Sequence, residues 1–393
     1  MKEIVAEKKE SMLDFLAREG ARKMLVEALE EEVTEFLERR KHERAKAEAK
    51  GYRNGKRERT VAVLGASLKV PFQKVEGVEY RSSILAPYQR RSEGVDELFR
   101  RLMVEGLSTR DFEPALRALI GDGTTLSAST MQRLAAKFQA DMDAFNRRDM
   151  SEARYAYVWA DGVYLKAGLE SEKAAILVLV GVNADGKKEL ISLMEGYRES
   201  YESWREIWRG VQGRGLASPL LVVGDGIPGL WKAVADVYPQ ARDQRCWVHK
   251  MRNVVDKVPK AKQPEVLDRL RAAYQADSRD LAEQHLALLA EDLEARYPKA
   301  ADCVRQDHEA LLRFFDYPKE HWIHLKTTNP IESIFAGVRL RTYVLRRFQK
   351  ARSGAAFVFK IIQRLAQFWS PIQKPDALGR LFVEQEKQEE VAA

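Results

Sequence analysis

Acidic residues at the ends of apolar strands are the first candidates for chemistry in this chain. Asp225 lies at the carboxyl end of Leu220–Val223, an apolar run bounded by Pro219 and Gly224 that is typical of a buried strand. Open α/β sheets bind ligands outside the carboxyl ends of their strands. The basic and aromatic stretch Arg245–Asn253 follows closely. An acid at a sheet edge beside basic residues indicates metal-assisted phosphate chemistry, although many strand-end Asp residues only cap the next helix.

Asp161 is the more informative acid, because it lies inside the aromatic and apolar segment Ala156–Lys166. A charge within a buried strand is costly unless it is paired or bound to a metal. The sequence therefore predicts that Asp161 has a partner that the strand itself does not supply.

Glu332 is the third candidate, since it follows a helix cap and the first-turn residue Pro330. The stretch Arg339–Arg352 behind it holds six Arg or Lys and no acid. A carboxylate followed by a basic helix would hold a phosphodiester over a metal. Glu320 and Asp316 compete for this role, but they lie in a proline-broken approach to the helix where an exposed charge needs no explanation.

The elements that must position these acids follow from the apolar pattern. A strand carrying Asp161 is followed by an antiparallel pair at Ala174–Val182 and Lys188–Met194, a helix at Ser203–Val211 and the strand before Asp225. This is the order of a ribonuclease H-like sheet, in which the first and fourth strands are parallel neighbours. Asp161 and Asp225 are therefore expected side by side.

The stretch Arg39–Arg59 holds ten Lys or Arg against three Glu. Its glycines predict a mobile arm and its charge predicts phosphate contact, with a solvated basic loop as the alternative. Beyond it, Val61–Pro71 alternates like a strand or hairpin around Gly65. The candidate contacts are Arg53, Lys56, Arg57 and Arg59.

Three helices are predicted between Val95 and Phe145, at Asp96–Glu105, Arg110–Ile120 and Met131–Phe145. Two short helices joined by a glycine-containing turn resemble a helix-turn-helix, and trihelical packing without DNA is the alternative. In a helix-turn-helix, the groove-facing residues would be Ser129, Gln132, Arg133 and Lys137.

The amino-acid composition limits the class of protein to which this chain can belong. Of 393 residues, 45% are hydrophobic and 32% charged, and no apolar run approaches the roughly 20 residues of a membrane span. Two cysteines make no disulfide framework and fit a reducing compartment, and the N-terminus lacks the apolar core of a signal peptide, so a cytoplasmic location is expected. The net charge of +7 and pI of about 9.1 favour a polyanionic partner.

The expected fold class is α/β: a ribonuclease H-like mixed-sheet catalytic domain with an all-helical insertion, preceded by a mainly helical DNA-binding region. The insertion is indicated by leucines at helical spacing and by the absence of strand signals between Lys257 and Tyr317. The expected parts are a helical, candidate dimerisation region (1–50), the basic arm and helix-turn-helix (51–150), the catalytic domain (151–245 and 321–370), the insertion (246–320) and a charged tail (371–393).

Seven ordered stretches together resemble the mutator-type transposases of bacterial insertion sequences, which are DDE enzymes on a ribonuclease H-like fold. They are GYRNGKRER from Gly51, YQRR from Tyr88, GLSTR from Gly106, WADGVYLK from Trp159, VGDG from Val223, RCWVHKMRN from Arg245 and TTNPIES from Thr327.

This resemblance implies binding to the terminal inverted repeats of an element, cleavage there and joining of the freed 3′-hydroxyl to target DNA. It implies that Asp161, Asp225 and Glu332 are catalytic and bind Mg²⁺, with Mn²⁺ as a substitute. A homodimer or larger homo-oligomer associated with the bacterial nucleoid is expected. Further DNA contacts are expected from Arg245, Lys250, Arg252, Asn253, Arg339 and Arg341.

The resemblance also implies a Cys-x2-His signature after the second acid, here Cys246 and His249. Both residues are expected to pack behind Asp225 and orient the catalytic edge. A zinc site that adds Cys303 and His308 is the alternative, but the long helical segment between the two pairs disfavours it.

Two other functions fit part of this pattern. A non-catalytic, sequence-specific DNA-binding regulator explains the basic arm and the helix-turn-helix, but not an acid inside a buried strand. A structure-selective nuclease on the same fold explains the acids, but not a separate DNA-reading region.

Overall fold

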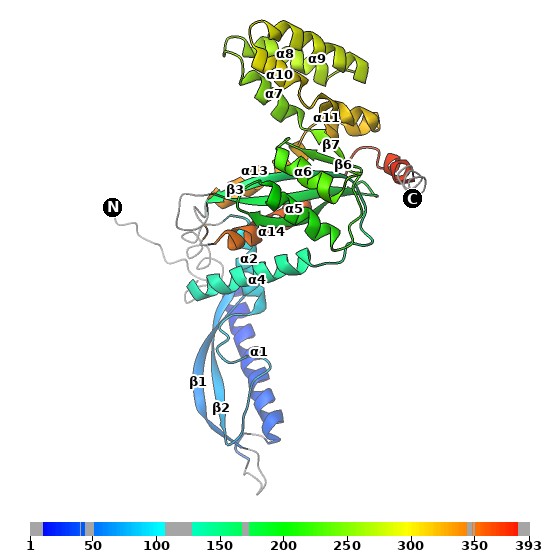
Figure 1. Cartoon of the computed structure of the whole chain (residues 1–393). Coiled ribbons are helices and arrows are strands. Elements are labelled where there is room, and N and C mark those ends of the chain that lie inside the picture. The colour runs from blue at the N-terminus through cyan, green and yellow to red at the C-terminus, as the bar shows by residue number, and fades with distance from the viewer. Residues whose placement is uncertain are drawn as a thin grey trace, which may run out of the picture. The chain divides into compact units, whose positions relative to one another are not determined.

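The computed structural model describes residues 11–39, 41–43, 51–106, 128–166, 173–343, 348 and 350–383 (Figure 1). The chain divides into two compact units, Met1–Gln132 and Arg133–Ala393. Among the described residues, no helix combines the length and the apolarity needed to cross a lipid bilayer.

The described part of the first unit combines helices with a β-hairpin. Helix α1 (Met12–Leu37) packs on the antiparallel pair β1 (Tyr52–Val63) and β2 (Ala66–Glu76), and α2 (Glu93–Val104) follows. Gly65 adopts a φ of +83° in the connection between the strands, which a residue without Cβ tolerates. The predicted hairpin around Gly65 is confirmed, and its strands are longer than expected. Its small core comprises Leu29, Val61, Ala66, Leu68, Val70 and Leu85.

From Tyr52 onward, the stretch predicted to be a mobile basic arm is instead a strand, since Tyr52–Val63 forms β1, whereas residues 40 and 44–50 of that stretch lie outside the described residues. A register shift between Arg53 and Lys56 absorbs the Asn54-Gly55 pair as a bulge, and Gly55 takes a φ of +66° there. Pairing with β2 satisfies the backbone on one side of the strand. The hairpin is a β element within an N-terminal region that was expected to be mainly helical, and the described residues of this region also include α1 and α2.

Two of the three helices of the predicted helix-turn-helix lie in the described residues. Helix α2 corresponds to the first, and α4 (Ala128–Asn146) corresponds to the third. The second predicted helix, Arg110–Ile120, lies outside the described residues, so the motif stays a prediction.

The division between the units falls within α4, earlier than the expected limit at residue 150. The apolar side of this helix is buried in the second unit, where the Phe138 ring lies 6.3 Å from Phe357 and the Phe145 ring 5.0 Å from Phe359 of α14 (Ala351–Ala366). Most of the helix therefore belongs to the second unit.

The second unit is built on a five-stranded mixed sheet. In space the strands run β5-β4-β3-β6-β7, and β4 is antiparallel to both of its neighbours, while β3, β6 and β7 are mutually parallel. The expected parallel pairing of the first and fourth strands is thus confirmed. The strands are β3 (Tyr155–Lys166), β4 (Lys173–Asn183), β5 (Lys188–Gly196), β6 (Leu221–Gly224) and β7 (Arg242–Arg245).

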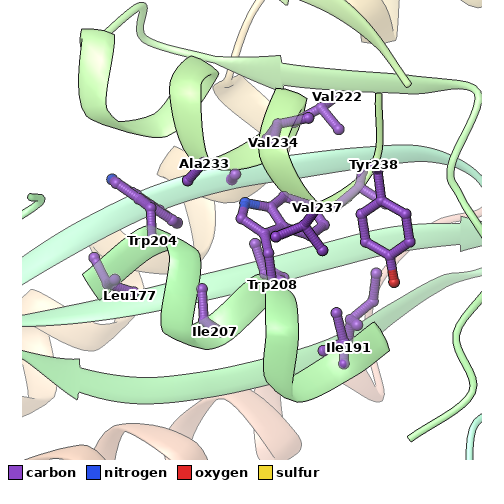
Figure 2. Close-up of a cluster of buried hydrophobic side chains, with 14 of the residues drawn as sticks. Leu177, Ile191, Trp204, Ile207, Trp208, Val222, Ala233, Val234, Val237 and Tyr238 are labelled. Carbon is purple, nitrogen blue, oxygen red and sulfur yellow. The ribbon is translucent and has the colours of Figure 1, made fainter. Parts of the chain in front are cut away.

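Helices cover both faces of this sheet because its strands are apolar on both sides. On one face, Trp204 and Trp208 of α5 (Tyr201–Gln212) pack against α6 (Pro228–Val237) and the strands, as Figure 2 shows. Residues of opposite parity on β4, such as Val178, are also fully buried. Helices α13 (Asn329–Tyr343) and α14 pack against β3 and β5.

Between β7 and α13 the chain is entirely helical. The elements are α7 (Trp247–Val255), α8 (Gln263–Tyr274), α9 (Arg279–Glu294), α10 (Pro298–Arg305), α11 (His308–Leu312), two short 3-10 turns (Arg313–Asp316 and Lys319–His321) and α12 (Trp322–Leu325).

The two ends of this insertion are joined at its base. The backbone N–H of Trp247 donates to the carbonyl of Lys326 at 2.9 Å. The Lys326 ammonium donates to the Tyr274 carbonyl at 2.6 Å, and it lies 4.7 Å from the centroids of both the Tyr274 and Phe314 rings. Burial lowers the pKa of Lys326 to about 8. Lys326 therefore links the insertion to the segment that leads into α13.

The expected charged tail is described as far as residue 383, and this part is packed rather than frayed. The Ile372 N–H donates to the Gly186 carbonyl at 2.9 Å, and Leu378 is fully buried.

Candidate active site

Asp161 lies on β3, and Asp225 directly follows β6, the parallel neighbour of β3. The register pairs Tyr157 with Leu221 and Trp159 with Val223. Two residues further along, the same register places position 161 beside position 225 at the carboxyl edge of the sheet. The structure thus brings together the first two acids singled out by the sequence.

Each of these carboxylates also accepts a local backbone hydrogen bond. Asp161 Oδ1 accepts from the Gly162 N–H at 2.7 Å, and Asp225 Oδ1 accepts from the Ile227 N–H at 3.0 Å. The second bond helps to form the entry to α6. Asp225 therefore both stabilises the turn that leads into α6 and lies close to Asp161.

Asp161 has an unusual protonation equilibrium. Burial raises its pKa to about 7, and the negative charges of Glu199 and Asp225 add to the effect. The Gly162 N–H and His249 act in the opposite direction. A cation that approaches this carboxyl group would stabilise its ionised form.

Glu199 is a fourth acid at this site, and sequence reasoning missed it. Burial raises its pKa to about 7, with a further contribution from the charge of Asp225. A Cβ atom built on Gly162 would lie 2.4 Å from Glu199 Oε1, so the carboxylate occupies space that only a glycine leaves free. The sequence signal for this contact was Gly162, because a glycine within a strand often marks a place where another group packs closely against the backbone.

Glu332 lies in the first turn of α13 and is tied to Thr328. The Thr328 hydroxyl lies 2.6 Å from Glu332 Oε1 and 3.3 Å from Cys246 Sγ, and the Thr328 N–H donates to the same sulfur at 3.4 Å. His249 Nδ1 lies 3.8 Å from Glu332 Oε1. The third acid is therefore connected to the Cys-x2-His pair.

Cys246 and His249, which were expected to pack behind Asp225, group with Glu332, and His249 is also close enough to Asp225 to respond to its charge. The adjacent Cys246 sulfur raises the pKa of His249, and the charges of Asp225 and Glu332 add to this against desolvation. Burial alone would raise the pKa of Cys246, but His249 and Thr328 lower it.

The structure does not form the alternative zinc site. Among the described residues, Cys246 and His249 group with Glu332, and neither Cys303 nor His308 joins them. His308 belongs instead to an exposed group with Glu283 and Glu309 on the insertion, where Arg279 pairs with both acids.

Arg245, predicted to contact DNA, is buried beside Asp225. A Cβ atom on Gly226 would lie 1.1 Å from Arg245 Nη1, and Gly226 has a φ of +86°, so this position requires glycine. Nε and Nη1 of Arg245 have no hydrogen-bond partner within the part of the chain that the structure describes.

Lys250, which was predicted to contact phosphate, is buried and bonded within the chain. Only 2% of this residue is exposed, its ammonium donates to the Gln306 carbonyl, and it lies 3.8 Å from Asp307 Oδ2. Lys250 therefore fastens α7 to the end of α10. Arg252 and Asn253, further along α7, are exposed.

Three of the four candidate contacts on β1 make internal bonds. Arg53 donates to groups at the end of α1, Arg59 donates to the carbonyls of the 85–89 loop, and Lys56 pairs with an acid of α1. The guanidinium groups of Arg53 and Arg59 thus make bonds within the first unit, and their predicted phosphate contacts stay a prediction. Arg57 is exposed.

The other predicted DNA contacts lie on α4 and α13. Gln132, Arg133 and Lys137 are exposed along α4, and Arg339 is exposed on α13. Arg341 is half-buried, with its Nη1 3.4 Å from the Gly337 carbonyl. The Ser129 side chain is outside the described part.

Comparisons with known proteins agree on one family. The profile described as "Transposase, Mutator family" matches residues 1–371. The chain is 44% identical over 281 residues to the transposase for insertion sequence element IS6120 of Mycolicibacterium smegmatis, covering 72% of this chain and 87% of the relative. It is 38% identical to the IST2 transposase of Acidithiobacillus ferrooxidans (69% and 92% covered) and 32% identical to the ISRM5 transposase of Rhizobium meliloti (90% and 88% covered).

Proposed function

The chain belongs to the mutator family of transposases, and we propose that it cleaves DNA at the ends of an insertion sequence and joins the freed 3′-hydroxyl to target DNA. The observation that carries this proposal is the position of Asp161 on β3 and of Asp225 directly after β6, its parallel neighbour, where the charge of Asp225 acts on Asp161. The strand order β5-β4-β3-β6-β7, with β4 alone reversed between its neighbours β5 and β3, supports a ribonuclease H-like catalytic domain.

The chemistry of these acids suits a divalent metal. Asp161, Asp225 and Glu199 interact as like charges, and burial and mutual repulsion raise the pKa values of Asp161 and Glu199. Carboxylate oxygens are the preferred protein ligands of Mg²⁺ and also suit Mn²⁺. Asp161, Asp225 and Glu332 would hold such an ion. When bound, divalent ions activate the attacking oxygen and stabilise the leaving oxygen in phosphoryl displacement.

The surrounding residues position these acids. The backbone N–H groups of Gly162 and Ile227 fix one oxygen each of Asp161 and Asp225, which leaves their other oxygens for a ligand. Thr328 fixes one oxygen of Glu332. Each carboxylate therefore has one oxygen held by a neighbouring group before substrate binds, which reduces the reordering that binding requires.

We propose double-stranded DNA, including the terminal inverted repeats and the target, as the partner of the exposed basic and polar residues. DNA contacts from these positions would be sensitive to salt because they neutralise phosphates. Assembly as a homodimer or larger homo-oligomer is part of the same proposal. The proposed contacts are Arg57, Gln132, Arg133, Lys137, Arg252, Asn253 and Arg339.

The test uses the full chain and a labelled element end with Mg²⁺. The proposal expects cleavage at the end, then a product in which the labelled 3′ end is joined to target DNA, and neither product with Asp161→Asn. Cleavage without joining would favour a structure-selective nuclease. Specific binding without either product would favour a DNA-binding regulator.

A further inference from the structure

Three ligand atoms of different chemical kinds converge next to the proposed catalytic edge. The sulfur of Cys246, a ring nitrogen of His249 and a carboxylate oxygen of Glu332 all lie within 4.8 Å of one another. They come from two elements, the start of α7 and the first turn of α13. Neither the proposed strand cleavage nor the proposed joining uses the sulfur or the imidazole.

The nitrogen of His249 that faces this group has an unused hydrogen-bonding position. Nδ1 is buried, has no hydrogen-bond partner among the residues that the structure describes, and lies 3.8 Å from Glu332 Oε1. Buried polar atoms are nearly always satisfied, so an orphaned one indicates a missing partner. A cation between Nδ1, the sulfur and the carboxylate would supply that partner.

The site is held in place before any ligand arrives. The Cys246 N–H donates to the Gly224 carbonyl at 2.8 Å, and the Cys246 side chain is fully buried. Thr328 contacts both the sulfur and the Glu332 carboxylate, as outer-shell residues do at metal centres. The ligands therefore sit on fixed backbone rather than on a loop.

We propose that Cys246, His249 and Glu332 form a binding site for a thiophilic divalent cation of the Zn²⁺ type. Sulfur and imidazole ligands favour Zn²⁺, whereas Mg²⁺ takes oxygen ligands. Zn²⁺ binds such ligands at about 2.0–2.3 Å, so only a small closure of the group is required. Three protein ligands leave a fourth tetrahedral position open to water.

Occupation of this site would withdraw Glu332 from the Mg²⁺-dependent reaction. This consequence rests on the proposed function, because it requires Glu332 to act with Asp161 and Asp225. The binding of the thiophilic ion does not depend on that function. Traces of Zn²⁺ are thus expected to inhibit strand cleavage in Mg²⁺, and chelation of Zn²⁺ is expected to restore it.

Cobalt titration of the reduced full-length protein tests the site directly. Co²⁺ replaces Zn²⁺ and gives a near-ultraviolet charge-transfer band only when a thiolate is bound to it. The chain has two cysteines, so Cys303→Ser is the matched control for Cys246→Ser. We expect a sulfur band that saturates at one equivalent of site-bound Co²⁺ in the wild type and in Cys303→Ser, and no band in Cys246→Ser.

Two further variants keep the test valid if Cys246→Ser fails to fold. Glu332→Gln removes one ligand, and we expect it to weaken Co²⁺ binding at least tenfold while the sulfur band survives at saturation. Thr328→Val removes an outer-shell contact and is expected to weaken binding about 10- to 100-fold. Absence of the band in the wild type, its loss in Cys303→Ser, or unchanged Co²⁺ affinity in both Glu332→Gln and Thr328→Val would overturn the proposal.

The same titration separates this proposal from the proposed function. A sulfur band in a protein that does not cleave element ends in Mg²⁺ would support the site and count against the transposase chemistry. Cleavage in Mg²⁺ by a wild-type protein that gives no sulfur band would support the chemistry and reject the site.

Discussion

Replacing Asp161 by Asn is expected to stabilise the metal-free protein while removing its response to Mg²⁺. Asp161 carries its charge in a buried position beside two other acids, which raises its pKa from the usual 3.8 to about 7. Asparagine keeps the oxygen that accepts from the Gly162 N–H and removes the charge. A residue proposed to be essential for catalysis is therefore expected to lower the stability of the protein without metal.

The size and sign of the effect follow from this pKa. The folded state holds the Asp161 proton more tightly than the unfolded chain does. Its stabilising contribution is thus complete below about pH 4 and is lost as the pH rises through about 7. At about 1.4 kcal/mol per pH unit, the full difference is about 4 kcal/mol, an upper value for Asp161→Asn above pH 7. In a unit of this size, each kcal/mol changes Tm by about 2–4 °C.

The assay is thermal unfolding in EDTA between about pH 5 and pH 8, followed by tryptophan fluorescence. Asp161→Asn should show a shallower fall of Tm with pH than the wild type and a higher Tm at the alkaline end. Glu320→Gln, which changes an exposed acid, serves as the control and should follow the wild type. Excess Mg²⁺ should raise the Tm of the wild type at pH 8 but not that of Asp161→Asn. A metal-free variant that is less stable than the wild type throughout would refute this reasoning.

Three further predictions concern other parts of the molecule. Asp225→Asn and Glu332→Gln should abolish cleavage of a labelled element end without changing its gel shift, whereas Glu320→Gln should retain both; near-normal cleavage by Glu332→Gln would remove it from the catalytic set. Lys250→Met leaves a buried carbonyl without its donor, so urea unfolding should show a loss of about 1–3 kcal/mol. DNA binding by this variant should keep the salt dependence of the wild type, and a shallower dependence would return Lys250 to the DNA interface. Trp208→Ala should lower the free energy of unfolding by about 3–5 kcal/mol, and a loss below 1 kcal/mol would contradict its place in the core of Figure 2.

The sheet and its two aligned acids were predictable because their signals are local. Apolar runs bounded by Gly and Pro located β3 and β6, and the order of strands and helix implied that these two would be parallel neighbours. A charge inside the first run then marked Asp161. Each of these inferences needed only a short window of sequence and a rule of topology.

The features that the sequence did not predict depend on contacts between distant residues. Glu199 lies just before α5 in a polar turn, and only the fold brings its carboxylate against Gly162. Lys250 belongs to a basic run, yet the turn of α7 directs it into the insertion. Arg53 and Arg59 lie in a segment whose composition is typical of a mobile arm, but pairing with β2 makes this segment a strand of the hairpin. Charge counts describe a segment and not the direction of its side chains.

The bond between Trp247 and Lys326 has an implication for how this family can vary. It closes the helical insertion at its base, so the residues between these two positions form a loop whose ends are already fixed. Enlarging a closed loop costs little, about 0.6 kcal/mol for each doubling of its length. Glu332 follows shortly after the closure, and its place relative to Asp225 is therefore independent of the insertion's length. Family members can therefore gain or lose helices in the insertion while the distance in space between the second and third acids stays constant.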